Sequence, residues 1–245
     1  MKPFLILQLR PEDEVSDNEF ESFLKFGGLS KKDVHRIRME RDGLYDVNLD
    51  DYSGVLVGGG PFNVSDTADI KTDVQQDFDA KLVKLLGEIC EKDFPYLGAC
   101  YGIGILSKSL KGIISKEKYS EDAGGVTIKL TEDGKKDPLL LRLPEEFRAF
   151  GGHKEACQSV PKGAILLASS IACPVQMIKV KENIYGAQFH TELDTVGIEF
   201  RVRAYKNHGY FPPENAEKLI EECCKETVEV PMEILRRFVQ RYRRE

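Results

Sequence analysis

The chain has 245 residues, of which 41% are hydrophobic and 31% are charged, and its formal net charge is −6. This composition is typical of a globular protein with a sizeable core, and the acidic balance argues against nucleic acid as the main partner. No apolar run is long enough to span a membrane, and the N-terminal apolar stretch is too short for a signal peptide. The six cysteines form neither CxxC pairs nor a metal-ligand spacing. We therefore expect free thiols, a cytoplasmic location, no bound metal and no cofactor.

The first half of the chain alternates apolar runs of strand length with segments of helical periodicity. Such alternation is typical of βαβ units, which build a mainly parallel sheet covered on both faces. Strands are expected over 3–9, 33–40, 51–60 and 94–98, and helices over 18–26, 70–92 and 101–110, the first capped by Ser16 or Asp17 and ended by Gly27-Gly28.

Shorter β-like runs follow between about 113 and 190, and helical segments return after them. The runs cover 124–130, 146–152, 164–170, 174–180 and 183–190, and the helices 194–206, 213–226 and 231–243. We predict one α/β domain, a three-layer sandwich with a core over about 1–206 and a C-terminal helical extension over about 213–245. The arginine-rich last helix is expected to pack one face on the domain; a docking surface for a partner synthetase or nucleic acid is the alternative.

A cysteine lies where the expected strand 94–98 meets the expected helix 101–110. Residues 98–102, Gly-Ala-Cys-Tyr-Gly, have the form glycine–x–nucleophile–x–glycine. A strand-to-helix turn this tight strains the nucleophile and needs glycine on both sides. It would place the sulfur of Cys100 at a helix N-terminus, which favours the thiolate, and would make the Tyr101 backbone N–H a donor to an oxyanion. A buried structural cysteine is the alternative.

His190 and Glu192 are the candidate base and its orienting carboxylate. On an extended strand, positions two apart share a face, so the carboxylate can hold the imidazole ring. The alternatives are a core histidine and an H-x-E metal pair, but no further ligands occur at a suitable spacing. A metal site is therefore not expected here.

Three motifs, VGGGP (57–61), PYLGACYG (95–102) and YGAQFHTE (185–192), occur in this order. Together they resemble the motifs of class I (triad-type) glutamine amidotransferases, in particular the glutaminase half of GMP synthetase. The likeness spans roughly residues 50–195. It implies the flavodoxin-like architecture of that family.

The resemblance also implies a reaction and a set of site residues. Cys100 would attack the carboxamide of glutamine to give a γ-glutamyl thioester and ammonia, which a separate acceptor or synthetase subunit would use. His190 would shuttle protons, Glu192 would orient His190, and Gly60 and Tyr101 would supply the oxyanion-hole N–H groups. The substrate would lie along Gly59, Pro61, Gly104, Gly152 and His153, with His153 as a wall residue and not as the base.

The sequence departs from the family pattern at two positions. Gly104 stands where the family usually has a substrate-holding glutamine, and Thr191 stands where proline is frequent. The first change leaves room for a γ-glutamyl compound other than glutamine. Two alternatives therefore stay open, a γ-glutamyl peptidase and a non-catalytic member that binds a metabolite or partner. The sequence determines neither the ammonia acceptor nor the oligomeric state.

Overall fold

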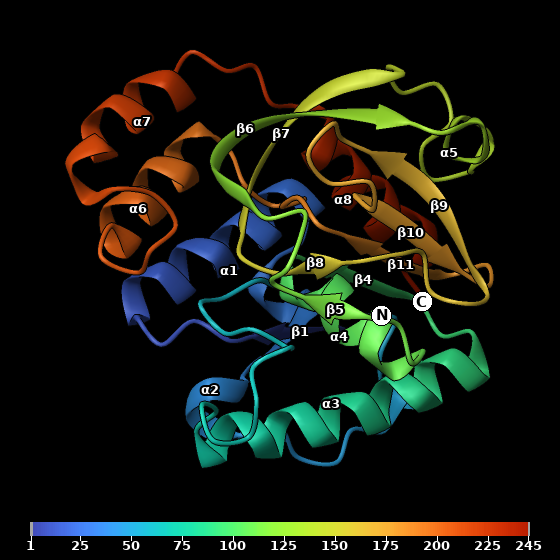
Figure 1. Cartoon of the computed structure of the whole chain (residues 1–245). Helices are drawn as coiled ribbons and strands as arrows, with labels where there is room; N and C mark the ends of the chain where they lie inside the picture. The colour runs from blue at the N-terminus through green and yellow to red at the C-terminus, as the bar shows by residue number, and fades with distance from the viewer. Residues whose placement is uncertain (1, 245) are drawn as a thin grey trace.

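The structure is a computed structural model that describes residues 2–244. A nine-stranded sheet in the order β2-β1-β3-β4-β11-β10-β9-β6-β7 runs through the molecule, with helices on both faces (Figure 1). The strands from β2 to β11 in this order are parallel, and the strands from β10 to β7 continue the sheet in antiparallel pairing. The predicted α/β sandwich with a mainly parallel centre is confirmed.

The elements have the following bounds. The large sheet contains β1 (Phe4–Gln8), β2 (Val34–Arg38), β3 (Gly54–Val57), β4 (Tyr96–Ala99), β6 (Glu121–Leu130), β7 (Glu146–His153), β9 (Ala164–Ser169), β10 (Met177–Val180) and β11 (Ile184–Ala187). A small second sheet pairs β5 (Ile114–Ser115) with β8 (Ala156–Cys157). The helices are α1 (Asp13–Gly27), α2 (Met39–Asp42), α3 (Asp73–Lys92), α4 (Tyr101–Ser109), α5 (Glu132–Lys136), α6 (Thr195–Tyr205), α7 (Ala216–Cys223) and α8 (Val230–Tyr242).

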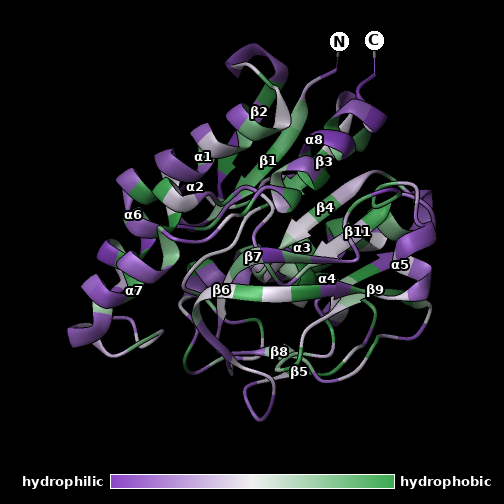
Figure 2. Ribbon diagram, turned by 90° about the horizontal axis from the view of Figure 1, so that it is seen from above, coloured by the Kyte–Doolittle hydropathy of each residue, from purple (hydrophilic) through white to green (hydrophobic). Residues whose placement is uncertain are grey.

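The hydrophobic core has a half on each side of the sheet. Helices α3 and α4 cover one face, where Phe78 and Ile103 are fully buried. Helices α1 and α8 cover the other, where Phe23 and Phe238 are buried against the strands. Figure 2 shows hydrophobic residues gathered on the central strands β1 and β3. Burying each such side chain contributes about 1.5–3 kcal/mol, so both layers hold the sheet rigidly.

Helix α8 packs as its apolar spacing predicts. Ile234, Leu235, Phe238 and Val239 have no exposed surface and belong to the same core half as α1. Arg236 and Arg237 lie on the other side and pair with Glu233 of the same helix. Among residues 2–244, none of the helices combines the length and apolar content that crossing a bilayer requires.

The structure corrects some local expectations. Helix α1 begins at Asp13, earlier than a Ser16 or Asp17 cap would allow, because acidic Asp13 and Glu14 favour the first turn of a helix. It does end as predicted, with Gly28 in the left-handed region at φ 63°. Between the expected strands 124–130 and 146–152 the chain forms the short helix α5, whose first turn is capped by Thr131 Oγ1 accepting from the Gly134 N–H.

Four parallel strands end at the same edge of the sheet. Arg10 follows β1, Gly59 and Gly60 follow β3, Cys100 follows β4 and His190 follows β11. In open α/β sheets, ligands bind outside the carboxyl ends of the strands. The register of the parallel strands therefore brings segments up to 180 positions apart in the chain to one place.

Candidate active site

Cys100 lies at the predicted tight turn between β4 and α4. Its backbone has φ 51° and ψ −96°, a strained conformation for a side chain other than glycine, and its N–H donates to the Ala187 carbonyl at 2.8 Å. A Cβ on Gly98 would lie 2.8 Å from Gly102 Cα, so no larger residue fits there. The turn leaves the Cys100 side chain partly accessible.

His190 and Glu192 face the same way, as the two-residue spacing predicts. Nδ1 of His190 lies 2.8 Å from Oε1 of Glu192, and both side chains are buried. A carboxylate only accepts, so Nδ1 carries the hydrogen of this bond, and Nε2 keeps a lone pair. A base oriented in this way can accept a proton at Nε2.

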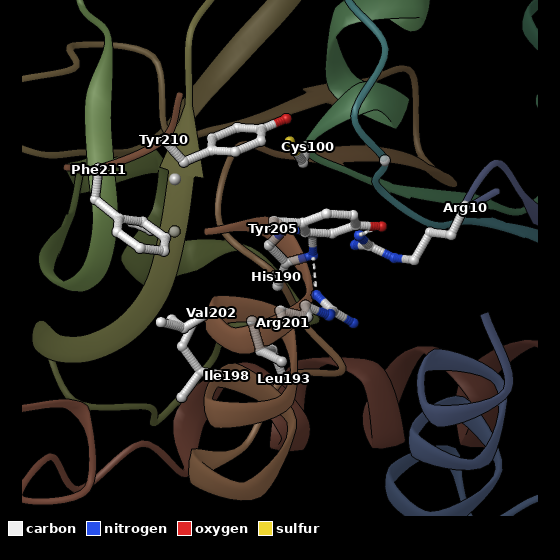
Figure 3. A pocket seen from close by; sticks show the side chains of 14 residues that line it. Arg10, Cys100, His190, Leu193, Ile198, Arg201, Val202, Tyr205, Tyr210 and Phe211 are labelled. Atoms are coloured by element: carbon white, nitrogen blue, oxygen red, sulfur yellow. Dashed lines mark hydrogen bonds between the residues drawn. The ribbon is translucent and has the colours of Figure 1, made fainter. Parts of the chain in front are cut away.

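The cysteine and the histidine border one cavity at the sheet edge (Figure 3). A Cβ built on Gly59 would lie 2.5 Å from His190 Cε1 and 3.2 Å from Cys100 Cβ. His190 Cε1 and Cys100 Cβ thus both lie within 3.2 Å of the position that a Cβ of residue 59 would occupy. Only glycine, which has no Cβ, leaves this position empty. The structure brings Cys100, His190 and Glu192 together from β4 and from the segment after β11.

The protonation states follow from burial and neighbouring charge. Burial raises the pKa of Cys100 to about 12, although the cation of Arg10 acts against it. The thiol is therefore protonated at rest, and the thiolate expected from the helix N-terminus is wrong for this state. Burial also lowers the pKa of His190 below 6.5, against the opposing effect of Glu192. The resting pair is a neutral thiol beside a neutral imidazole.

A buried ionic network supports the back of this site. Arg201 of α6 donates from Nη2 to Glu192 Oε1 at 2.9 Å, and its Nη1 lies 3.1 Å from His190 Nδ1 (Figure 3). Burial alone would raise the pKa of Glu192, but His190 and Arg201 outweigh it and hold that pKa well below its ordinary range. Arg10 Nε donates to Glu19 Oε1 at 2.7 Å, and Glu19 is fully buried.

A grouping of Glu19, His190 and Glu192 has the geometry to hold a cation. The guanidinium groups of Arg10 and Arg201 already neutralise these carboxylates. This chemistry does not fit a metal ion, in agreement with an acid–base role for His190.

The expected oxyanion donors lie beside Cys100. Gly60 borders the cavities on both sides of the cysteine, and Tyr101 begins α4. Within residues 2–244, neither backbone N–H has a hydrogen-bond acceptor. A Cβ on Gly60 would lie 2.4 Å from the Leu9 carbonyl oxygen, so glycine is needed for this close approach.

A second cavity on the other side of Cys100 contains most of the expected substrate-binding residues. Gly104, Gly152 and His153 line it, whereas Gly59 and Pro61 line neither cavity. His153 contacts the Glu155 carbonyl oxygen through Nδ1 and Glu121 Oε2 through Nε2, both at 2.9 Å. Both ring nitrogens are thus engaged, which suits a wall residue better than a base.

Sequence reasoning missed the charged and aromatic residues that complete the site. These are Arg10, Glu19, Glu155, Arg201, Tyr205 and Tyr210. Only Arg10 had a usable signal, because it follows the first expected strand and so lies at the edge where ligands bind. The others lie on helices and loops, where a single charged or aromatic residue is ordinary.

Several known proteins are similar to this chain in sequence. A GMP synthase (glutamine-hydrolysing) from Exiguobacterium sibiricum is 26% identical over 182 residues, which are 74% of this chain and 30% of that protein. The corresponding enzyme from Thermosipho africanus is 31% identical over 142 residues, 58% of this chain and 24% of the relative. The chain thus spans less than a third of the length of these relatives.

The fold likeness extends over the whole chain. A glutamine amidotransferase from Thermotoga maritima superposes with a TM-score of 0.77 at 20% identity, covering 99% of this chain and 98% of that one. The family model "Glutamine amidotransferase class-I" matches residues 14–196, which include Cys100, His190 and Glu192. The chain therefore belongs to the class I glutamine amidotransferase family.

Proposed function

We propose that this chain hydrolyses the side-chain amide of glutamine through Cys100 and releases ammonia for a separate acceptor. The observation that carries the proposal is the shared cavity of Cys100 and His190, with Glu192 2.8 Å behind the imidazole. Family membership supports the same reaction type. A nucleophile, a base and an orienting carboxylate are the three parts that thiol-dependent acyl transfer needs.

In the first half of the reaction the sulfur of Cys100 attacks the amide carbon. Because thiol and imidazole are both neutral at rest, Nε2 of His190 takes the thiol proton as the C–S bond forms. The N–H groups of Gly60 and Tyr101 stabilise the oxyanion. The C–N bond then breaks, His190 returns its proton to the leaving nitrogen, and ammonia and a γ-glutamyl thioester result.

The second half repeats the chemistry with water. His190 accepts a proton from the water that attacks the thioester and returns it to the sulfur as the C–S bond breaks, so that glutamate leaves and Cys100 is restored as a thiol. In both halves an imidazolium forms next to Glu192, whose carboxylate stabilises it. Arg201 keeps that carboxylate ionised and in place.

The proposal includes a separate synthetase or other acceptor for the ammonia, which the name of the GMP synthase relatives supports. It also includes a cytoplasmic location. All six cysteines are free, which suits a reducing compartment.

A γ-glutamyl peptidase is the second candidate, and the cavity next to His190 favours it. Its wall contains Leu193, Ile198, Val202 and Phe211, an apolar surface that ammonia alone does not require. Gly104 also contributes no side chain on the other side of Cys100. A leaving group larger than ammonia could therefore bind against this wall.

One comparison of substrates separates the candidates. The full chain and Cys100→Ala are assayed for ammonia release from glutamine and for cleavage of γ-glutamyl dipeptides, and each is treated with an electrophilic glutamine analogue before mass spectrometry. Ammonia release that is lost in Cys100→Ala supports the glutaminase. Cleavage of the dipeptides without glutamine turnover supports the peptidase. No cleavage and an unlabelled Cys100 would refute both and leave a binding protein.

A further inference from the structure

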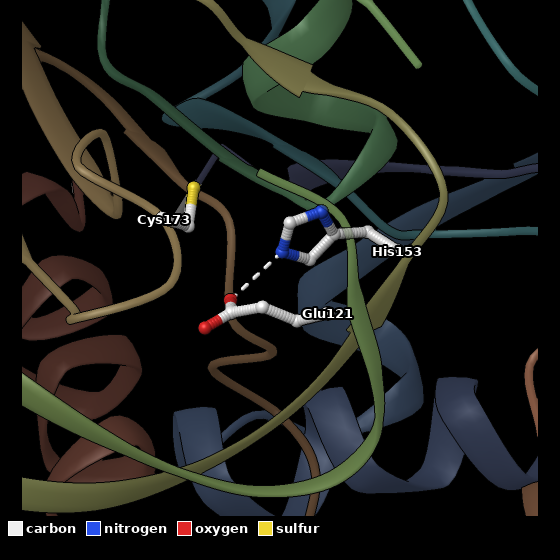
Figure 4. Close-up of side chains that lie close together, drawn as sticks. All are labelled: Glu121, His153 and Cys173. Atoms are coloured by element: carbon white, nitrogen blue, oxygen red, sulfur yellow. Dashed lines mark hydrogen bonds and ion pairs between the residues drawn. The ribbon is translucent and has the colours of Figure 1, made fainter. Parts of the chain in front are cut away.

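Three side chains of metal-ligand type meet behind the wall of the second cavity. Glu121 lies at the start of β6, His153 at the end of β7, and Cys173 in the loop between β9 and β10 (Figure 4). One ligand atom from each lies within 4.8 Å of the other two. We call these three residues the Glu–His–Cys cluster. Three separate segments thus place a carboxylate, an imidazole and a thiol around one point.

If the His153 ring is neutral, there is no hydrogen between its Nε2 and the Glu121 carboxylate. Nδ1 of His153 faces the Glu155 carbonyl oxygen at 2.9 Å and therefore carries a hydrogen. Nε2 faces Glu121 Oε2, also at 2.9 Å, and a carboxylate only accepts. With a neutral ring, two lone pairs would oppose each other. A second proton on the ring or a metal cation between the two atoms removes this repulsion.

Among the basic side chains of residues 2–244, only the imidazole of His153 pairs with the Glu121 carboxylate. His153, Ser170 and Gln176 contact its carboxylate oxygens at 2.9, 2.9 and 2.5 Å. Within the described part of the chain, no lysine or arginine pairs with it. The carboxylates of Glu19 and Glu192 differ, because arginines neutralise both. A buried anion with only neutral and imidazole partners is a favourable place for a cation.

An orphaned polar atom next to the cluster points to the same conclusion. Gln176 is 1% exposed, and its Oε1 has no hydrogen-bond partner within residues 2–244. Its Nε2 donates to Glu121 Oε2 at 2.5 Å. Rotation of this amide by half a turn would direct the oxygen toward the cluster, which becomes favourable once a cation is bound there.

Glu121 borders the surface of the molecule, and His153 adjoins the substrate side. Glu121 and Ser170 line a surface hollow of about 440 Å³, next to the fully exposed Ile171. On the inner side, His153 lines the cavity beside Cys100. An ion could therefore enter without passing the candidate nucleophile.

We propose that Glu121, His153 and Cys173 bind one divalent ion of the zinc class, with Gln176 Oε1 as the fourth ligand. Thiolate, imidazole and oxygen donors in fourfold coordination are the set that Zn²⁺ prefers. On binding, the Cys173 thiol releases its proton to solvent and the sulfur forms the bond to the metal. The Nδ1–H of His153, held by the Glu155 carbonyl, already fixes the tautomer that a metal-binding Nε2 needs.

The bound ion would fasten a wall of the substrate cavity. It joins the end of β7 to the loop that contains Cys173. Two residues after His153, the Glu155 carboxylate accepts from the backbone N–H groups of Val64 and Ser65 at 2.6 and 2.8 Å. The ion would hold His153, and the nearby Glu155 holds the loop after β3. Binding of the ion should therefore raise the melting temperature of the protein.

The test is titration of the full chain with Co²⁺, which reports a bound sulfur through a thiolate-to-cobalt absorption band. The background is Cys100→Ala, so that the candidate nucleophile cannot supply the sulfur. We expect one equivalent to bind with this band and with tetrahedral d–d bands, and Zn²⁺ to displace it. Titration without any one-equivalent sulfur band would overturn the proposal.

Variants in that background assign the ligand. Cys173→Ser should abolish the sulfur band and weaken binding at least about tenfold. The matched control is Cys157→Ser, because Cys157 is equally buried but bonds Ser107 outside the cluster. The proposal is wrong if the band survives Cys173→Ser or disappears in Cys157→Ser. Should Cys173→Ser fail to fold by circular dichroism, Glu121→Gln decides: the same weakening supports the site, and unchanged affinity refutes it.

Discussion

Arg201 Nη2 lies 2.9 Å from Glu192 Oε1, so helix α6 fixes from behind the carboxylate that orients His190. The second guanidinium nitrogen, Nη1, lies 3.1 Å from His190 Nδ1. Nδ1 already donates its hydrogen to Glu192. The contact from Arg201 therefore acts through its positive charge, which lies beside the imidazole ring. Arg201 is therefore a positioning residue that also opposes protonation of the base.

Replacing Arg201 should change both stability and the pH dependence of activity. Arg201→Met leaves the Glu192 carboxylate buried without its counter-ion, which should cost about 3–5 kcal/mol of unfolding free energy. Loss of the positive charge should raise the pKa of His190 and move the acidic limb of kcat/KM to higher pH. Denaturant titration and a pH–rate profile measure the two effects.

Arg201→Lys is the control for this prediction, because it keeps the charge. Its acidic limb should stay closer to that of the wild type than the limb of Arg201→Met. If both variants show the wild-type limb, Arg201 has only a structural role.

Removing the sulfur of Cys100 should abolish turnover without loss of the fold. Cys100→Ala should lower kcat/KM for the hydrolysed substrate at least about 10³-fold, because no other group can form the acyl intermediate. Cys223→Ala is a suitable control, since Cys223 is buried on α7, lines neither cavity and should leave most of the activity. Equal losses in the two variants would contradict a nucleophilic role for Cys100.

Activity should fall on the acid side below the ordinary pKa of histidine. The pKa of His190 is lowered from 6.5, so the neutral base persists to lower pH than in a free imidazole. The pKa of Cys100 is about 12, so no ionisation of this thiol should appear between neutral and mildly alkaline pH. We expect kcat/KM to show an acidic limb below 6.5 and no rise that tracks a free thiolate. A bell-shaped pH profile of kcat/KM whose acidic limb follows the ionisation of Cys100 would contradict the neutral resting pair of thiol and imidazole.

The same shift makes folding stability depend on pH. The unfolded chain binds a proton at His190 more readily than the folded chain does, so stability is lost as the pH falls through 6.5 toward the folded pKa. Thermal unfolding between about pH 7 and pH 5 should therefore show a smaller loss in His190→Gln than in the wild type. His208→Gln, at an exposed histidine, should behave as the wild type.

A methyl group at Gly59 should separate the base from the nucleophile. In Gly59→Ala the new Cβ would lie 2.5 Å from His190 Cε1, so the ring must move, and activity should fall about 10²-fold or more. Gly87→Ala is the matched control: it lies exposed within α3 with no atom within 4 Å of the new Cβ. That variant should keep its activity and gain up to about 1 kcal/mol in stability.

Long periodic segments were predictable from sequence because their side chains report one environment over many residues. The strand at 3–9 and the helix at 70–92 appear as β1 and α3. The two-residue strands β5 and β8 were not predicted, because such short segments contain no measurable period. Helix α5 was not predicted either, because glycine and lysine follow its Thr131 cap.

The sequence by itself determined the triad candidates and the strand-to-helix turn at Cys100, because local motifs encode backbone conformation and the facing of neighbouring side chains. Only the tertiary structure decided that Arg10, Glu19 and Arg201 meet behind the site, since sheet register and helix packing bring these distant positions together. It also decided the charge of Cys100. The helix N-terminus favours a thiolate locally, but the loss of water around the partly accessible sulfur outweighs this, and solvent exclusion is a property of the whole fold.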